Sequence, residues 1–511
     1  MTGGGPALTL PAMDPVLGAF VGYLVVVVAI GVWASRFSSG GVGEFFLAGR
    51  SLNRWVVALS AVVSGRSSWL ILGLSGLAWA QGVSALWAAV GYIVVEFVLF
   101  WTYAGRLRRF SGAHDCLTLP DVYAARFDDR RGVLRLLIVA VLLVFLPTYV
   151  GAQFVAGGKT FASAFGVGET NGVLITAVIV LAYTVTGGFL AVSLTDVLQA
   201  LFMVVALVVL PVVAITDKGG WDAVTAELSR LDATLLDPMA LSLGALVGLL
   251  GIGLGSPGNP HILVRYMSID DPGQLRASAL LGTAWNVIMA AGAVLIGLAG
   301  RAWFPVATLL PGGDREALSV VLSEQHLPPV VHGIVLASIF AAIMSTTDSQ
   351  LLVAASSVVR DVYQQFLRKG RGAAGGVADE AADSARMVRL SRVVVLVLVL
   401  VAIGLGLAGG ELVFWFVLLA WGGLGAALGP TSILALYWKR TTHAGVVAGM
   451  AVGAVTVFVW DAYDGFGLYE LVPAFGLGAL ATVLVSLVTR PPANVDAMFD
   501  TMRTPEPRSR P

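Results

Sequence analysis

The chain has 511 residues, of which 57% are hydrophobic and only 12% are charged, and its formal net charge is zero. Soluble domains carry about 25% charged residues, so the composition excludes a soluble protein. It predicts a multi-pass protein of the cell membrane, with the lipid bilayer as a partner. Zero net charge and the lack of a basic tract argue against a nucleic-acid partner, and the single cysteine, Cys116, excludes an internal disulfide.

Apolar segments long enough to cross a bilayer, about 20 residues each, recur along almost the whole chain. Glycine, proline and charged interruptions divide them into thirteen predicted transmembrane helices. Between the ninth and tenth spans, Gly370 to Ala385 predicts a mobile cytoplasmic linker, and residues 491–511 predict a disordered cytoplasmic tail. The spans are expected to begin near Val16, Trp55, Val83, Val133, Gly172, Asp196, Leu241, Ala277, Pro328, Arg392, Glu411, His443 and Leu468.

The distribution of basic residues predicts the orientation. With thirteen spans and an external N-terminus, most of the 31 lysines and arginines fall in cytoplasmic loops and the tail, including Arg265 and Arg276 after span seven. An even number of spans would scramble this asymmetry. The bias therefore predicts an N-terminus outside and a C-terminus inside.

Two spans are expected to be broken helices. Arg66 lies in span two within Ser64-Gly65-Arg66-Ser67-Ser68, where a charge at bilayer depth persists only beside a partner, a cavity or a ligand. Span seven contains the segment Gly251 to Pro260. Its four glycines and two prolines disfavour a continuous helix. Interrupted helices five spans apart are typical of inverted-repeat transporters that bind solute and ions between the breaks. The alternative is that these glycines only permit close helix packing.

Six short motifs occur in order along the chain: Phe46 to Leu52, Ala58 to Ala61, Thr118 to Asp121, Gly187 to Asp196, Pro260 to Leu263 and Ala342 to Thr346. From about Phe46 to Val488 they resemble the sodium/solute symporter family, in particular its proline-transporting members. The resemblance implies an all-α, leucine-transporter-type core of two inverted five-helix repeats. The implied division is residues 1–50 (N-terminal segment, first span and loop), 51–215 (first repeat, spans two to six), 216–437 (second repeat, spans seven to eleven), 438–490 (spans twelve and thirteen) and 491–511 (tail).

The resemblance also implies two cation positions. The principal sodium site would use oxygens of Val63, Arg66, Ala342, Ser345 and Thr346, although serine and threonine in membrane helices often bond the preceding turn instead. A deeper position would use an acid on span six and a polar face of span nine. Its residues would be Asp196, Ser345, Asp348 and Ser349, with a helix N-cap as the alternative role of Asp196.

Arg66 departs from the family pattern, because the proline transporters carry aspartate and methionine where this chain has Gly65 and Arg66. Three interpretations follow. Arg66 occupies or screens the sodium site and makes transport sodium-independent or proton-coupled; it pairs with Asp348; or it binds a substrate carboxylate. The ion pair with Asp348 ranks slightly ahead, since an unpaired arginine and an unpaired aspartate would both be unfavourable.

The implied solute site lies between the two breaks and span four. A half-helix N-terminus after the first break favours a carboxylate. The proline transporters carry Trp and Tyr where this chain has Ile252 and Ser256, so a roomier or more polar pocket is expected. Gln153 has helix packing as an equally plausible role. The predicted substrate residues are Ser67, Ser68, Trp69, Tyr149, Gln153, Ser256 and Pro260.

These features predict a secondary active transporter that takes up a small amino acid or organic carboxylate by alternating access. Sodium-coupled symport resembling proline uptake is the first hypothesis, and sodium-independent or proton-coupled transport is the second. A solute-sensing membrane module is the alternative from another class. No enzyme is expected, because the five histidines are scattered and no nucleophile–base pair or metal cluster appears. No cofactor is expected beyond sodium as coupling ion, and the sequence predicts no oligomeric state.

Overall fold

The computed structural model of the chain describes residues 14–36, 42–184, 188–367, 377–409, 412–463 and 467–503. This part of the chain is helical throughout, and its only strand-like feature is an isolated bridge between Leu52 and Ile269. It contains ten helical runs long and apolar enough to cross a bilayer, and two shorter apolar helices at Glu169–Thr184 and Leu243–Gly258. The composition-based prediction of a many-helix membrane protein is therefore confirmed.

The helices before the second break are α1 (Pro15–Ser35), α2 (Val42–Leu47), α3 (Arg54–Ser68), α4 (Ser75–Gln81), α5 (Leu86–Val98), α6 (Ala104–Ala113), α7 (Leu119–Phe127), α8 (Val133–Phe165), α9 (Glu169–Thr184), α10 (Phe189–Asp217), α11 (Trp221–Leu231) and α12 (Leu243–Gly251). Those after it are α13 (Pro260–Ser268), α14 (Leu275–Trp303), α15 (Leu318–His326), α16 (Pro329–Ser356), α17 (Val377–Ala408), α18 (Val413–Tyr437), α19 (His443–Ala462), α20 (Leu471–Val488) and α21 (Val495–Arg503).

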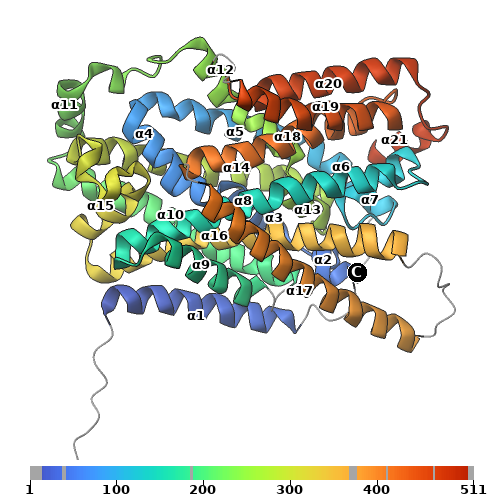
Figure 1. Cartoon of the computed structure of the whole chain (residues 1–511), viewed down its shortest axis with the longest axis horizontal. Coiled ribbons are helices and arrows are strands. Elements are labelled where there is room, and N and C mark those ends of the chain that lie inside the picture. Colours follow the sequence, from blue (N-terminus) through green and yellow to red (C-terminus); the bar gives the residue numbers. More distant parts are fainter. Residues whose placement is uncertain are drawn as a thin grey trace, which may run out of the picture.

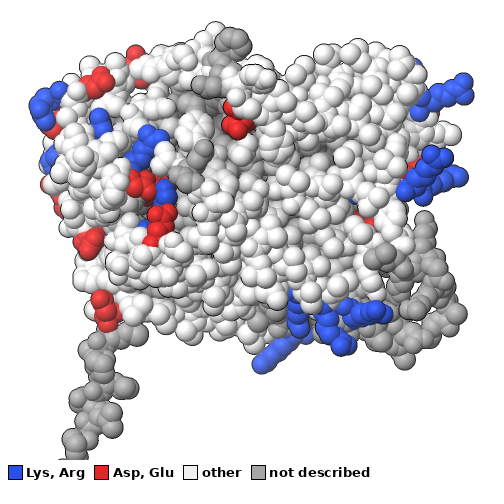
Figure 2. All heavy atoms as spheres, viewed as in Figure 1, with Lys and Arg blue, Asp and Glu red and all other residues white. Residues whose placement is uncertain are grey.

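The long helices run side by side along one direction, and α3 lies in the middle of the bundle (Figure 1). It packs against α10, α13, α14 and α16. Burial separates inner from outer helices: 83% of the most apolar windows of α16 and α18 is buried, against 22% for α1. On the face shown in Figure 2, most charged side chains lie toward the two ends of the molecule, and the surface between them is largely uncharged. Such a surface suits lipid contact, because apolar side chains there face hydrocarbon instead of water.

The helix of span two breaks at Ser67. This residue has φ 48° and ψ −171°, a conformation that an L-residue adopts only when its surroundings impose it. Its side-chain oxygen accepts the backbone N–H of Trp69 at 3.1 Å, so the residue that ends one helix also caps the next. A π-helical segment, η2 (Trp69–Leu74), follows before α4. The predicted break is therefore confirmed.

Span seven is also broken. After α12 the chain forms a 3-10 segment, η6 (Ile252–Gly258), and Asn259 is extended with φ −96° and ψ 100°. Helix α13 then starts at Pro260. Proline is tolerated at this position because the first N–H groups of a helix have no hydrogen-bond partner within the helix. The glycines serve close packing as well, since a Cβ on Gly253 would lie 2.2 Å from the carbonyl oxygen of Gly91 on α5. The segment is therefore a broken helix, and its glycines also permit close packing.

The structure differs from the sequence-based predictions at the start of span six, in the tail and in part of the linker. The rest of the linker lies outside the described residues. Helix α10 begins at Phe189, so Asp196 lies in its second turn and is not an N-cap. Part of the tail predicted to be disordered forms α21, which packs on α6 and buries Met498, Phe499 and Met502. Of the predicted linker, residues 377–385 belong to α17, and residues 370–376 lie outside the described part of the chain.

Candidate functional site

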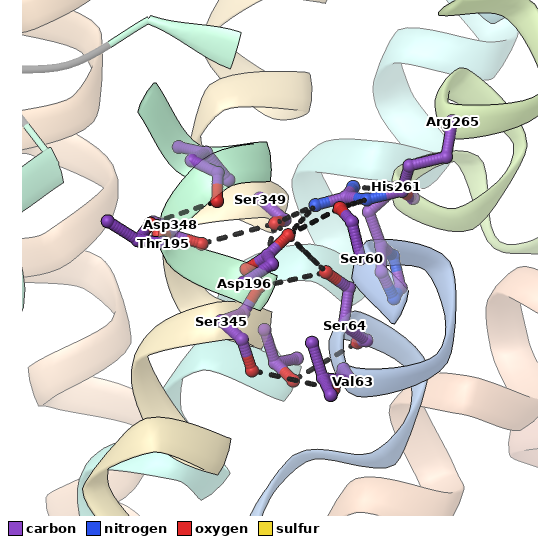
Figure 3. Close-up of polar contacts among 12 residues, drawn as sticks. Ser60, Val63, Ser64, Thr195, Asp196, His261, Arg265, Ser345, Asp348 and Ser349 are labelled. Carbon is purple, nitrogen blue, oxygen red and sulfur yellow. Dashed lines mark hydrogen bonds and ion pairs between the residues drawn. The ribbon is translucent and has the colours of Figure 1, made fainter. Parts of the chain in front are cut away.

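A cluster of oxygen atoms lies where α16 passes the C-terminal end of α3 (Figure 3). The hydroxyl of Ser345 lies 3.4 Å from the carbonyl oxygen of Val63 and 3.1 Å from that of Ala342. The hydroxyl of Thr346 donates to the carbonyl oxygen of Ser64 at 3.1 Å. All of these side chains are buried. Four of the five predicted sodium-site residues thus lie together, with oxygens that a hard cation prefers.

The fifth, Arg66, relates differently to this cluster. Its carbonyl oxygen accepts the backbone N–H of Trp69, and its side chain leaves in another direction. Residue 66 is two positions after Ser64, which is about 200° around a helix, so the two side chains face opposite sides of α3. Ser64 faces Ser345 on α16, with 3.1 Å between its hydroxyl and the Ser345 carbonyl oxygen. Arg66 therefore points away from the predicted sodium site.

The partner of Arg66 is Glu96 on α5, and the predicted ion pair with Asp348 was wrong. A terminal nitrogen of Arg66 contacts Glu96 Oε1, and Arg66 Nε donates to Asn286 Oδ1 at 2.9 Å. Asn286 in turn donates to Glu96 Oε2 at 2.9 Å, and the guanidinium lies 3.7 Å from the centre of the Tyr92 ring. Glu96 and Asn286 were missed. The sequence did contain a signal for Glu96, because this acidic residue falls within the predicted span three. An unpaired charge is as unfavourable there as it is in span two.

The predicted deeper cation position holds an ion pair. Asp196 Oδ2 accepts hydrogen bonds from Ser60 at 2.5 Å, Ser64 at 3.3 Å and Arg265 at 2.9 Å. On α16, Ser349 accepts from the same Arg265 nitrogen at 2.5 Å and contacts Asp348 Oδ1 at 3.1 Å. Asp196 and Arg265 are both fully buried. The predicted residues Asp196, Ser345, Asp348 and Ser349 thus form one polar network (Figure 3).

Arg265 was wrongly expected in a cytoplasmic loop. It lies in α13, which continues to Ser268, and its side chain points inward to Asp196. The sequence contained one clue: Arg265 follows the predicted break at Pro260 by only five residues. A helix of that length advances about 7.5 Å, too little to carry a midplane residue to the membrane surface.

The predicted substrate residues on spans two and four meet each other. Gln153 Oε1 accepts both the backbone N–H of Ser68 at 3.1 Å and its hydroxyl at 2.8 Å. The hydroxyl of Tyr149 lies 3.4 Å from that of Ser67. Trp69 stacks on Phe414 of α18, with ring centres 5.3 Å apart, so an aromatic pair borders this region. Gln153 therefore stabilises the break in span two through its hydrogen bonds to Ser68. This is the helix-packing role that was the alternative to substrate binding.

Polar atoms without partners lie at the break in span seven and on Gln153 of α8. Ser256 Oγ, Asn259 Oδ1, both ring nitrogens of His261 and Gln153 Nε2 are buried and make no hydrogen bond within the described residues. The His261 ring lies 6.1 Å from that of Tyr149, so these atoms and the first break border one region. Buried polar groups are nearly always satisfied, and unpaired ones mark a place for water or ligand. Pro260 contributes only the first turn of α13.

Charged groups close the two ends of the bundle. At one end Lys159 pairs with Asp314 at 2.9 Å and Glu316 at 2.6 Å beside a cavity of about 820 Å³. Glu316 also accepts the backbone N–H groups of Val413 and Phe414, both at 2.9 Å, at the start of α18. This contact joins η10 (Arg315–Ala317) to Phe414, the residue whose ring stacks on Trp69.

At the other end Asp121 contacts Arg135 at 2.6 Å and Arg360 at 2.7 Å. Burial alone would raise the pKa of Asp121, but the attraction of Arg360 and Arg135 is stronger and holds it below its usual value. The carboxylate therefore stays ionised, and it ties α7 to α8 and to η11 (Ser357–Leu367), the π-helical continuation of α16.

The comparisons with known proteins agree with this architecture. The profile of the sodium:solute symporter family matches residues 45–453. The chain is 37% identical over 479 residues to the sodium/proline symporters of Staphylococcus aureus strains JH9 and NCTC 8325, with 92% of each chain covered. Among solved structures, a Na+-coupled sialic acid symporter has a TM-score of 0.76 at 18% identity, with 93% of this chain and 98% of that chain covered.

A second solved structure, a nucleobase-cation-symport-1 family transporter, has a TM-score of 0.54 at 15% identity, covering 91% and 99% of the two chains. At these identities the two structures support the fold alone. The homologues are transporters of the cell membrane and not enzymes. Family match and relatives together show that the chain is a multi-pass membrane protein that belongs to the sodium:solute symporter family.

Proposed function

We propose that the chain is a sodium-coupled symporter that takes up a small amino acid or a related carboxylate, with L-proline the first solute to test. The observation that carries this proposal is the oxygen cluster of Val63, Ala342, Ser345 and Thr346 beside the Ser67 break. The sodium/proline symporters of Staphylococcus aureus, to which the chain is 37% identical, support the choice of solute.

The sodium ion would be held by carbonyl oxygens of Val63 and Ala342 and by the two hydroxyls on α16. These atoms are neutral, buried and converge from two helices, which suits a monovalent hard cation that exchanges in each cycle. Arg66 supports this proposal because its guanidinium faces Glu96 and Asn286 on the opposite side of α3. Sodium-independent transport, which required Arg66 at the site, is therefore the weaker hypothesis.

The solute would lie between the two breaks, where the buried polar atoms lack partners. The backbone N–H groups that follow Ser67, at the start of a half-helix, favour a carboxylate there. Ser256 and His261 offer polar contacts from span seven, and Trp69 with Phe414 offers an apolar wall. A small zwitterion with a short side chain fits this combination.

The proposed topology has thirteen crossings, with the N-terminus outside and the C-terminus inside. Within the described residues, ten long helical runs, one of which (Arg54–Ala113) is interrupted at Gly82, and two shorter apolar helices support this number. At the end of the molecule that carries α7 and α21 most of the visible charged side chains are basic, whereas acidic and basic side chains are mixed at the other end (Figure 2). The positive-inside rule assigns the basic end to the cytoplasm.

Uptake of radiolabelled L-proline into proteoliposomes tests the proposal. We expect an inward sodium gradient to drive uptake, and a proton gradient alone to drive none. Ser345→Ala/Thr346→Ala should raise the sodium concentration for half-maximal uptake at least about tenfold, a loss of about 1.4 kcal/mol. Ser338→Ala is the matched control, since Ser338 lies on the same helix and bonds only the carbonyl of Val335.

Two outcomes would contradict the proposal. Uptake that is unchanged without sodium would refute sodium coupling. Specific solute binding without uptake of any amino or organic acid under any gradient would favour the sensor.

A further inference from the structure

A groove of about 510 Å³ lies between η11 and α17 and is lined by Tyr363, Arg386, Arg389, Leu390 and Val393. Tyr363 belongs to η11, and the other four residues belong to α17. Helix α17 is an outer helix of the bundle: only 33% of the most apolar window in its run Arg386–Ala408 is buried. The groove therefore lies on the outside of the bundle, where lipid surrounds a membrane protein.

The two arginines of the groove form no ion pair within the described residues. Both side chains are exposed, and the guanidinium carbon of Arg386 lies 5.8 Å from the centre of the Tyr363 ring. Arg360, also on η11, differs from them because it pairs with Asp121 at 2.7 Å. The groove thus presents two guanidinium groups whose charge no described acid neutralises.

The order of residues along α17 places these arginines at a membrane boundary. The order is acidic, then basic, then apolar: Asp379, Glu380 and Asp383 precede Arg386, Arg389 and Arg392, and residues 393–403 are apolar throughout. Arg389 and Val393 are four residues apart, which is about 6 Å along a helix. In a bilayer the phosphate groups lie between the hydrocarbon and the water, so the arginines are at the depth of the phosphates and the acids lie further toward the water.

The groove also has an apolar part on the membrane side of the guanidinium groups. Leu390 and Val393 line it, and Val393 is 57% exposed. The exposed apolar surface continues along α17 through Leu396, Val397 and Leu400, which recur every three or four residues and so form one stripe. Water would solvate the arginines but not this stripe. One phospholipid suits both, with its phosphate at the guanidinium groups and an acyl chain along the stripe.

We infer that the groove between η11 and α17 binds one anionic phospholipid of the cytoplasmic leaflet. Its phosphate would accept hydrogen bonds from Arg386 and Arg389, since guanidinium groups match phosphate oxygens in charge and geometry. An anionic lipid is favoured over a zwitterionic one, because the head group of the latter brings a second cation close to the arginines. The leaflet follows from the proposed topology, and the inference does not depend on the solute or the coupling ion.

Native mass spectrometry of the purified full-length protein, titrated in detergent with phosphatidylglycerol or phosphatidylcholine, tests the inference. The wild type should bind phosphatidylglycerol at least about tenfold more tightly than phosphatidylcholine. Arg386→Gln/Arg389→Gln should weaken phosphatidylglycerol binding at least about tenfold, because both guanidinium groups are lost. Arg386→Lys/Arg389→Lys keeps the charge and should retain most of the affinity.

Two further variants separate charge from shape. Arg130→Gln/Arg131→Gln is the matched control: it removes the same charge from exposed positions between α7 and α8, at the same end of the molecule, and should leave phosphatidylglycerol binding unchanged. Val393→Trp keeps both arginines but fills the apolar part of the groove, so it should weaken the binding. Water-soluble glycerol phosphate, which has no acyl chain, should not displace the bound lipid.

Three outcomes would overturn the inference. Equal affinity of the wild type for the two lipids, or equal loss in the two arginine-to-glutamine double variants, would show attraction to charge in general. Displacement by glycerol phosphate would show an anion site that makes no use of acyl chains. The comparison of the two lipids on the wild type decides the inference even if a variant fails to fold. None of these outcomes bears on sodium symport, which the uptake assay tests separately.

Discussion

Arg66 and Glu96 illustrate how two residues that are each unfavourable in lipid become acceptable together. Their side chains are 2% and 4% exposed, and Asn286 bonds both. A buried pair of this kind adds little stability relative to a neutral pair of similar volume, but removal of one partner strands the other charge. The pair therefore explains why an arginine can follow Gly65 at the edge of the break.

A double-mutant comparison tests this pairing. Arg66→Met should lower the free energy of unfolding by about 3–5 kcal/mol, because Glu96 loses its counter-charge. Arg66→Met/Glu96→Gln should recover most of that loss, measured by denaturant unfolding in detergent. Arg230→Gln is the control: its partner Glu227 is one turn away on the surface, and no measurable change is expected. A double variant as unstable as Arg66→Met would contradict the pairing.

Cys116 should be unreactive in the folded protein. It is 2% exposed, and burial together with nearby Asp121 raises the pKa of its thiol to about 12. Because the thiolate is the reacting species, the rate with N-ethylmaleimide at neutral pH should be at least about 1000-fold below that of a free thiol. Mass spectrometry of native and SDS-unfolded protein measures the difference. Rapid labelling of the native protein would contradict this prediction.

At the scale of elements, the glycines of span seven are set by the helices packed against it. Gly255 would place a Cβ 1.9 Å from Trp421 Nε1, and that nitrogen donates to the carbonyl of Ile252 at 2.8 Å. The break is thus held from α18 as well as from α5. Close packing and unwound backbone occur in one segment because buried carbonyls there need donors from neighbouring helices.

Gly253→Ala tests that packing. The added Cβ would meet the Gly91 carbonyl oxygen at 2.2 Å, so α5 and η6 must separate, and we expect a loss of about 1–3 kcal/mol in the free energy of unfolding. Gly476→Ala in α20 is the matched control, since no atom lies within 4 Å of its Cβ position. It should be neutral or slightly stabilising, because alanine favours helices. Equal free energies of unfolding for the two variants would contradict the prediction that close packing of η6 on α5 requires glycine at position 253.

Element existence and type were accessible from sequence, whereas some boundaries were not. The start of α10 at Phe189 was missed because Ser193, Thr195 and Asp196 interrupt the apolar run that a hydropathy reading follows. In the structure these polar residues are buried among partners from α3, α9, α13 and α16, so the helix passes through them. Helix α21 was missed because its buried face, Met498, Phe499 and Met502, is short and amphipathic.

For the whole molecule, the charge distribution predicts which end meets the cytoplasm. In a Cys116→Ser background, Asp237→Cys should react with a membrane-impermeant maleimide on intact cells. Asn494→Cys should react only after permeabilisation. Both residues are exposed; Asp237 follows α11 and Asn494 precedes α21, and these helices lie at opposite ends of the bundle (Figure 1). The reverse pattern would overturn the proposed orientation, and labelling of both from outside would overturn the odd number of crossings.

The sequence by itself determined the class of the protein, the family resemblance and the positions of the two breaks. These follow from local properties: long apolar runs must cross lipid, and the glycines and prolines of Gly251 to Pro260 weaken a helix wherever it is packed. Only the tertiary structure decided which charges meet. Arg66 turned out to face Glu96 and Arg265 to face Asp196, because partner choice depends on helix rotation and on contacts between segments far apart in the chain.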